Sequence, residues 1–367
     1  MAILWPGDVD TKVGEAIVTK SDVATVLSVS EFACAGLNTD VCREVRIRLE
    51  GGEDNGAVKE LVLEDATINP DVGEGDDLRV AKNVVPPGAD PVPGREYSIS
   101  DFDRQGPLLL LALIFAGVVV LFGRWRGAMS LIGLGLSLAV VLGFMVPAIL
   151  DGRSTLAVAI VGAVAVMLTT ILLAHGAGPK SLAAIVGTAA SLVVTVGLAV
   201  LFTDLTHLTG LASEEATFLQ INDAGVSLEG LLLAGMIVAG RGGLDDVTVR
   251  QWLAVLGLRA RHPGQSFRQL FTLAMDVGRD HVSATVNTLV LAYVGASLPL
   301  LLIFSSGQID FLDAVNLEII AKEIVATLVG SIGLIAAVPI TTALAVLLAR
   351  RMSADELAAV EPHGHSH

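Results

Sequence analysis

Residues 107–150 read PLLLLALIFAGVVVLFGRWRGAMSLIGLGLSLAVVLGFMVPAIL, and their only charged residues are Arg124 and Arg126. A helix of about 20 mainly apolar residues crosses the hydrocarbon core of a bilayer, so each side of this arginine pair can form one span. The stretch therefore predicts two membrane-spanning helices, 107–123 and 127–150, that are joined by a short basic turn.

Five further apolar runs follow, and we interpret each of them as a span. Four of these runs contain no charged residue, whereas the short run 226–240 contains Glu229. The five runs are 154–174, 181–203, 226–240, 282–304 and 324–348. A soluble protein has no way to cover so many uncharged runs with polar surface. We predict a polytopic α-helical membrane protein with about seven transmembrane helices between residues 107 and 350, and the lipid bilayer as its surroundings.

Composition separates this chain from soluble and nucleic-acid-binding proteins. The chain is 53% hydrophobic and 17% charged, with a net charge of −15 that belongs mainly to the first hundred residues, whereas soluble domains are about 25% charged. An acidic chain offers no patch that neutralises phosphates, so we expect no nucleic-acid partner.

Residues 1–95 have the character of a small β domain. Val45-Arg46-Ile47-Arg48-Leu49 alternates apolar and basic side chains, as a half-buried strand does, and Gly51-Gly52 is a turn signal. Five or six such short strands predict a small β-barrel-like domain, with an OB-like barrel as the specific form considered. Residues 85–95 (VPPGADPVPGR) form a linker to the spans.

The basic residues predict the orientation of the spans. Lys and Arg gather in alternate loops, and the loops between them carry acids with a single basic residue, Arg153. The positive-inside rule therefore places the tail 351–367 in the cytoplasm and the β domain outside a bacterial cell membrane. Export of that domain needs either a preceding span, of which residues 3–6 would be the last turn, or export by span 107–123 itself. Outside the cytoplasm, Cys34 and Cys42 could form a disulfide, and the alternative is two free core thiols.

The first polar cluster follows the short span 226–240. Arg241 precedes Gly242-Gly243, and Asp245 and Asp246 come next. Glycine pairs weaken helices, and short, glycine-interrupted spans point to binding sites in transporters. Asp245 and Asp246 are candidates to carry a proton or bind a cation, with Arg241 as a partner of Asp245; the alternative is an ordinary solvated loop.

Two further clusters lie at the ends of the last two spans. Asp280 and His281 precede span 282–304, and Asn287 lies inside it, where an amide needs a partner. Lys322 and Glu323 lie just before span 324–348, and Glu318 lies four residues before Lys322, within pairing distance on a helix. The alternative interpretation of the charged residues is interfacial anchoring.

Three segments carry a resemblance to a known family. Residues 278–302 read GRDHVSATVNTLVLAYVGASLPLLL, residues 322–345 read KEIVATLVGSIGLIAAVPITTALA, and residues 242–251 read GGLDDVTVRQ. The chain resembles the YibE/F-like family of bacterial membrane proteins, from the β domain to the last span. The resemblance implies a polytopic membrane protein and supplies neither a substrate nor catalytic residues.

Two functions follow as hypotheses. The first is a secondary transporter or permease of an unidentified small molecule or ion, with the clustered polar residues along its path. The second is a non-transporting scaffold or accessory subunit whose outer β domain binds a partner, in a homo-oligomer or with another membrane protein. A central polar cavity that contains the acids would favour transport, and a close-packed bundle would favour the scaffold. Motifs for zinc, serine or aspartyl intramembrane proteases and a P-loop are missing, so we expect no enzyme, no cofactor and no metal site.

Overall fold

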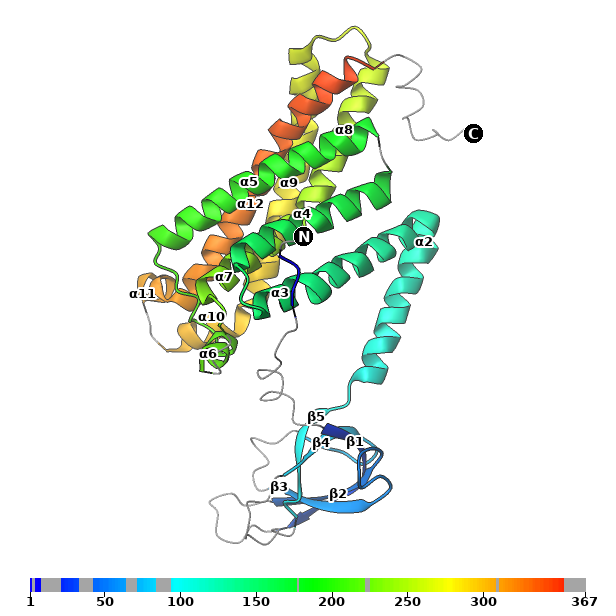
Figure 1. Cartoon of the computed structure of the whole chain (residues 1–367), viewed down its shortest axis with the longest axis vertical. Helices are drawn as coiled ribbons and strands as arrows, with labels where there is room; N and C mark the ends of the chain where they lie inside the picture. Colours follow the sequence, from blue (N-terminus) through cyan, green and yellow to red (C-terminus); the bar gives the residue numbers. More distant parts are fainter. Residues whose placement is uncertain are drawn as a thin grey trace. The chain divides into compact units, whose positions relative to one another are not determined.

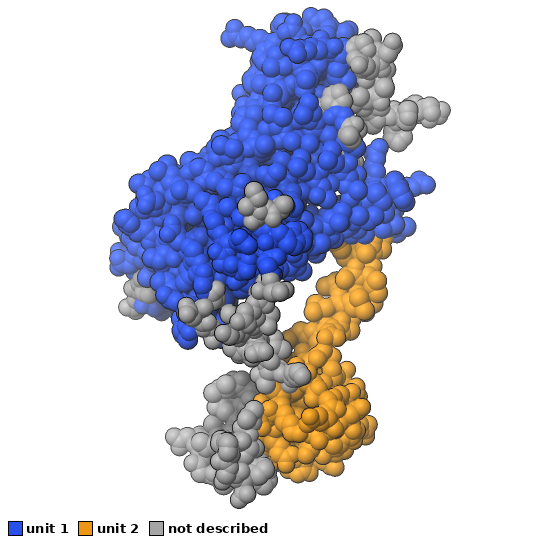
Figure 2. Space-filling model, in the orientation of Figure 1, with its two compact units in different colours: residues 1–10, 119–367 blue, residues 11–118 orange. Residues whose placement is uncertain are grey.

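The structure is a computed structural model of the whole chain (Figure 1). It describes residues 1, 4–7, 21–32, 42–63, 71–83, 94–176, 178–221, 225–307 and 310–352. The chain divides into two compact units (Figure 2). The β unit is Thr11–Val118, and the helical unit is Met1–Asp10 with Val119–His367. Most of the predicted linker and tail lies outside the described residues.

The β unit contains one antiparallel sheet of five described strands in the order β3-β2-β1-β4-β5. The strands are β1 (Ser21–Phe32), β2 (Cys42–Leu49), β3 (Val58–Leu63), β4 (Asp77–Lys82) and β5 (Tyr97–Phe102). The alternation predicted for β2 is confirmed, because Val45, Ile47 and Leu49 are buried while Arg46 and Arg48 are exposed.

The ends of this sheet curve toward each other. The backbone N–H of Val62 in β3 donates a 3.1 Å hydrogen bond to the carbonyl oxygen of Gly94, just before β5. Nearby, the Lys59 ammonium lies 2.6 Å from the Glu96 carboxylate. One face of the sheet surrounds an apolar core that includes Val45, Leu78 and Tyr97. The result is the half-barrel part of the predicted β domain.

Twelve described helical segments follow the sheet. They are α2 (Gln105–Val140), the π-helical η2 (Val141–Met145), α3 (Val146–Leu150), α4 (Thr155–His175), α5 (Pro179–Leu205), α6 (Glu214–Ile221), α7 (Leu228–Arg241), α8 (Leu244–Arg261), α9 (Phe267–Ala296), α10 (Leu298–Ser306), α11 (Phe311–Asn316) and α12 (Glu318–Ala349). Most of them belong to the helical unit, whereas the first residues of α2 belong to the β unit.

The lengths and compositions of these helices support a membrane-embedded protein. Four stretches are long and apolar enough to cross a bilayer, and α9 with α10, a pair bent by 60°, makes a fifth if it is one span. The four stretches are Gln105–Leu150, Thr155–Leu173, Ser181–Leu205 and Glu318–Ala349. The apolar part of α7, Leu228–Gly240, is shorter. Length and composition alone thus give four or five spans in the described chain, fewer than the seven predicted.

The long stretch Gln105–Leu150 is interrupted near its middle. Arg124 has φ 50° and ψ −132°, outside the helical region, so α2 consists of two helical segments that meet there. A Cβ atom added to Gly127 would lie 2.2 Å from the carbonyl oxygen of Val119, so only glycine fits this close approach. The interruption falls where the sequence predicts the basic turn.

The predicted glycine break is also present. Helix α7 ends at Arg241 and α8 begins at Leu244, so Gly242 and Gly243 separate the two helices. In the helix that follows, Leu244 and Trp252 are 0% and 1% exposed, whereas Asp246 in its first turn is exposed. One face of α8 therefore belongs to the core of the helical unit.

Helix α12 packs against α5, α7, α8 and α9 and forms the centre of the helical unit (Figure 1). Small residues bring these helices close together. A Cβ on Gly240 of α7 would lie 3.5 Å from the Cα of Gly330, and one on Gly333 would lie 2.0 Å from Oγ1 of Thr195 on α5. Close approach at small residues is the usual way in which membrane helices pack.

The basic ends of several helices lie at one end of this unit. A buried cluster joins Ala183 near the start of α5, Trp252 of α8, Leu270 near the start of α9 and Ala349 at the end of α12. Each of these residues lies close in sequence to basic residues that the positive-inside rule predicts on the same side of the membrane. The packing therefore brings those chain segments together, as a common membrane face requires.

Candidate functional site

The first predicted cluster lies at the start of α8. Asp246 is exposed; its Oδ1 lies 2.8 Å from Nε of Arg250, and its Oδ2 lies 3.5 Å from Nε2 of His281 on α9. Arg241 ends α7 and Asp245 lies in the first turn of α8, but their side chains lie outside the described part of the structure. The fold thus joins Asp246 and His281, which belong to different clusters in the sequence.

The second cluster lies along an exposed face of α9. Nη1 of Arg279 lies 2.7 Å from Oδ1 of Asp276, one turn earlier on the same helix. Asp280 and Asn287 are exposed. Within the described chain, neither of these two side chains has a hydrogen-bond or ion-pair partner. In the described structure, these polar groups lie on the outside of the helical unit.

The described interior of the unit is mainly apolar and contains several uncharged polar side chains. The side chain of Gln251 donates 2.7 Å hydrogen bonds to the Ala274 carbonyl and to Oγ1 of Thr342. The hydroxyls of Thr188 and Thr248 lie 3.1 Å apart, and Ser191 donates to the carbonyl of Gly333. These residues were not predicted from the sequence, although Thr188, Ser191 and Thr195 recur at helical spacing within span 181–203.

The third cluster lies near the start of α12. Nζ of Lys322 lies 3.9 Å from Oε1 of Glu323, and both side chains are partly buried. The expected pairing of Glu318 with Lys322 is wrong. The Glu318 carboxylate instead accepts hydrogen bonds from the backbone N–H groups of Thr209 and Gly210, each 2.7 Å long, and from the Thr209 hydroxyl. Backbone N–H groups hold a carboxylate more firmly than a flexible lysine does, because they are already fixed by the loop.

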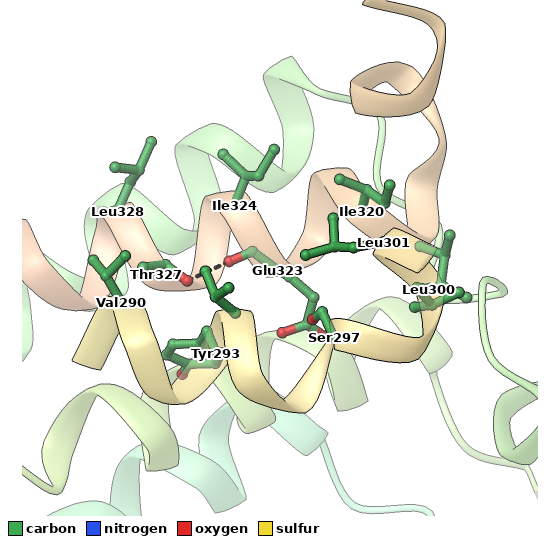
Figure 3. Close-up of a pocket in the computed structure, with 12 residues that line it drawn as sticks. Val290, Tyr293, Ser297, Leu300, Leu301, Ile320, Glu323, Ile324, Thr327 and Leu328 are labelled. Atoms are coloured by element: carbon green, nitrogen blue, oxygen red, sulfur yellow. Dashed lines mark hydrogen bonds between the residues drawn. The ribbon is translucent and has the colours of Figure 1, made fainter. Parts of the chain in front are cut away.

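Glu323 faces a groove between α12 and the α9–α10 bend (Figure 3). The cavity volume is about 230 Å³, and most of its walls are aliphatic, with contributions from Val290, Leu301 and Ile320. Among the described residues that line it, Glu323 alone carries a charge. Its side chain points from α12 toward Ser297 (Figure 3).

Ser297 marks the bend in this wall of the groove. It is both the C-cap of α9 and the N-cap of α10, and Pro299 lies in the first turn of α10. Proline cannot donate a backbone hydrogen bond, so the helix is interrupted here and the pair bends by 60°. The groove therefore combines a broken apolar helix with one carboxylate.

The predicted disulfide is not tested by the described residues. Cys42 is buried at the start of β2. Cys34 lies outside the described residues, so the pairing stays a prediction. Within the described chain, no group of three or more His, Cys, Asp or Glu side chains could hold a metal ion.

Comparison with known proteins adds the family. The family model described as YibE/F-like protein matches residues 111–351. This chain belongs to the YibE/F-like family. The YibE/F-like match contains the Glu323 groove, the Gln251 interior and the α9 face, whereas the five-stranded sheet lies before it. No curated protein and no solved structure matches the chain.

Proposed function

We propose that this YibE/F-like protein is a secondary transporter of the bacterial cell membrane, with Glu323 as the group that couples ion and substrate. The observation that carries the proposal is the Glu323 carboxylate, which faces the bend of a broken apolar helix across an aliphatic groove.

Seven spans follow if the interruptions are treated as boundaries. The stretch Gln105–Leu150 has 46 residues and would be roughly 70 Å long as one helix, about twice the thickness of a bilayer core. The break at Arg124 divides it into two spans. The other five spans are α4, α5, α12, the bent pair α9–α10, and α7, which is a short span that continues into α8. The total is therefore seven.

This arrangement fits an outer β domain and a cytoplasmic C-terminus. An odd number of spans places the two ends on opposite sides of the membrane, and the basic loops assign the inside. The sheet fits an OB-like barrel, because β1 pairs with both β2 and β4 while Val62 and Gly94 bring β3 near the chain that enters β5.

The Glu323 carboxylate can bind a cation from the groove. Ionised side chains inside membrane-spanning segments mark ion and substrate pathways. Within the described chain Glu323 pairs with Lys322, whose Nζ lies 3.9 Å from Oε1, but Lys322 does not line the groove, so the groove side of the carboxylate is open to a second cation. Exchange of the bound cation would change the charge opposite the bend at Ser297 and bias the position of α10 relative to α9. That coupling of charge to a hinge is what a secondary transporter needs.

Ion-coupled flux in liposomes tests the proposal. Full-length protein would be placed in vesicles that enclose the pH-sensitive dye pyranine, with an acidic interior and Na⁺, K⁺, Mg²⁺, phosphate or an amino-acid mixture added outside. We expect at least one addition to dissipate the pH gradient with the wild type, and Glu323→Gln to abolish the effect. Glu214→Gln, on exposed α6, should behave as the wild type. No response to any addition by wild-type protein would argue against transport.

The scaffold remains a second candidate because of one observation. Asp246 and Asp280 lie on the exposed surface, and the described interior is filled by uncharged side chains such as Gln251 and Thr342. A bundle of this kind can hold an outer β domain at the membrane without moving a solute. Wild-type vesicles that leave every gradient unchanged, together with a partner captured by the β domain in cells, would favour this alternative.

A further inference from the structure

Polar residues form a continuous stripe along one side of α9. Asp276, Asp280, Ser283 and Asn287 follow one another at intervals of four, three and four residues, and all four are exposed. This spacing places them on one helical face. We call these four residues the α9 stripe. Asn287 has no hydrogen-bond partner within the described chain.

The stripe enters the apolar part of the helix. Helix α9 with α10 qualifies as a bent membrane span, and no charged residue occurs between Val282 and Phe304. Asn287 lies more than one helical turn inside this uncharged segment. An amide that faces hydrocarbon without a partner is unfavourable, because lipid tails offer no hydrogen bonds. A group that can form hydrogen bonds must therefore contact the Asn287 amide in the membrane.

The first half of α2 cannot supply that cover. Residues 107–123 contain no Ser, Thr, Asn, Gln, His or charged side chain, so a contact with this segment would leave the amide unsatisfied. A second copy of the stripe can supply it. Asparagine amides donate and accept at once, so two of them at the same depth satisfy each other. Arg279, which pairs with Asp276 in its own chain, is next to Asp280 in the sequence and 68% exposed, so its remaining N–H groups can also reach an aspartate of the other copy.

We propose that two copies of this chain associate through the α9 stripe. Two copies with the same orientation in a membrane are related by a twofold axis along the membrane normal, which brings equivalent residues of α9 to the same depth. The Asn287 amides pair across the axis, Ser283 adds small-residue contact, and the charges of Arg279 and Asp280 alternate at the membrane surface. The interface depends on the location of α9 in the bilayer and not on whether the protein transports a solute.

Disulfide cross-linking in membranes is the first test. Asn287→Cys should give a covalent dimer when membranes that contain the full-length protein are oxidised. The matched control is Val193→Cys, at an apolar position of α5 that is 72% exposed, and wild-type protein gives the background from Cys34 and Cys42. We expect dimer from the residue 287 variant and only background from the control. Equal yields at both positions would overturn the proposal.

The mass of the protein in native lipid nanodiscs is the second test, and it needs no cysteine. The wild type should have the mass of two chains. Asn287→Leu should weaken dimerisation about three- to thirtyfold, the range for one hydrogen bond between membrane helices, whereas Asn287→Gln should retain it. A single chain in wild-type nanodiscs would overturn the proposal. A disulfide between the Asn287→Cys variant and a different protein in cells would also overturn it.

Discussion

Nε2 of Gln251 on α8 lies 2.7 Å from Oγ1 of Thr342 on α12, and both residues are buried. The same amide donates to the Ala274 carbonyl on α9, so one side chain connects three helices. The Thr342 hydroxyl in turn donates a 2.6 Å hydrogen bond to the Val338 carbonyl. Helix α8, which follows the glycine break, is thereby fixed in the core of the helical unit.

Replacement of Gln251 should destabilise the fold. Gln251→Leu leaves the Thr342 oxygen without its donor in the interior, and an unsatisfied buried polar group costs about 1–3 kcal/mol. The expected result is a lower unfolding temperature in detergent, measured by circular dichroism. Gln105→Leu, at the exposed start of α2, is the control and should leave the temperature unchanged. Equal temperatures for wild type and Gln251→Leu would show that the connection does not stabilise the fold.

The contact between α5 and α12 should not tolerate a methyl group. A Cβ on Gly333 would lie 2.0 Å from Oγ1 of Thr195, whereas nothing lies within 4 Å of a Cβ on Gly197. We expect Gly333→Ala to lower stability by about 1–3 kcal/mol through overpacking, and Gly197→Ala to be neutral or to raise stability by up to about 1 kcal/mol through helix propensity. The free energy of unfolding of the two variants, measured in parallel samples, checks both expectations. The packing described for α12 would be contradicted if the two variants behaved alike.

Glu318 should control the loop between α5 and α6. Glu318→Ala removes the three hydrogen bonds that the carboxylate accepts from Thr209 and Gly210. Hydrogen–deuterium exchange should then become faster at the amides of these two residues, because they lose their acceptor. Glu323→Gln is the control, since that carboxylate does not contact the loop, and it should leave exchange there unchanged. Persistent protection in the alanine variant would argue against this contact.

The β unit should lose stability in acid. The hydroxyl of Tyr97, at 2.6 Å, and then Lys82 hold the pKa of the Asp54 carboxyl below its ordinary value of 3.8. A lowered pKa in the folded state gives stability that is present above pH 3.8 and is lost as the pH falls through the folded-state pKa. We expect hydrogen exchange in β2–β5, corrected for intrinsic rates, to keep its protection from pH 6 to about pH 4 and to lose it as the pH falls further.

The matched variant for this acid effect is Asp54→Asn. It should be less protected than the wild type at pH 6, because the charged acceptor for Tyr97 and Lys82 is gone. It should also lose less protection on acidification, because one of the titrating groups has been removed. Parallel losses in the wild type and the variant would show that Asp54 does not contribute to the pH dependence.

Local patterns predicted the interruptions well. The arginine pair marked the break in α2, the glycine pair marked the boundary between α7 and α8, and the alternation in β2 gave its buried face. Each of these features depends on residues close together in sequence. Glycine, charge and strand periodicity act over a few residues, so a single sequence contains the information.

Contacts between distant segments were not predicted. Hydrophobicity identified the spans, but it does not say which helix Gln251 or Ser191 meets, because several polar partners lie at similar depth. Glu318 was assigned to Lys322 by spacing alone, whereas the fold places the Thr209 loop against it. Lys322 and Glu323 were selected as candidates at the start of the last span, but the groove that Glu323 lines also needs the bend at Ser297, which the sequence analysis did not predict.

The break in α2 is best tested by measuring membrane topology on its two sides. Alkaline phosphatase or green fluorescent protein would be fused after Arg126 and after Gly152, on the two sides of the predicted span 127–150. We predict fluorescence and an inactive phosphatase after Arg126, and an active phosphatase without fluorescence after Gly152. Fusions at both positions that report the same side of the membrane would contradict a span at 127–150 and with it the seven-span arrangement.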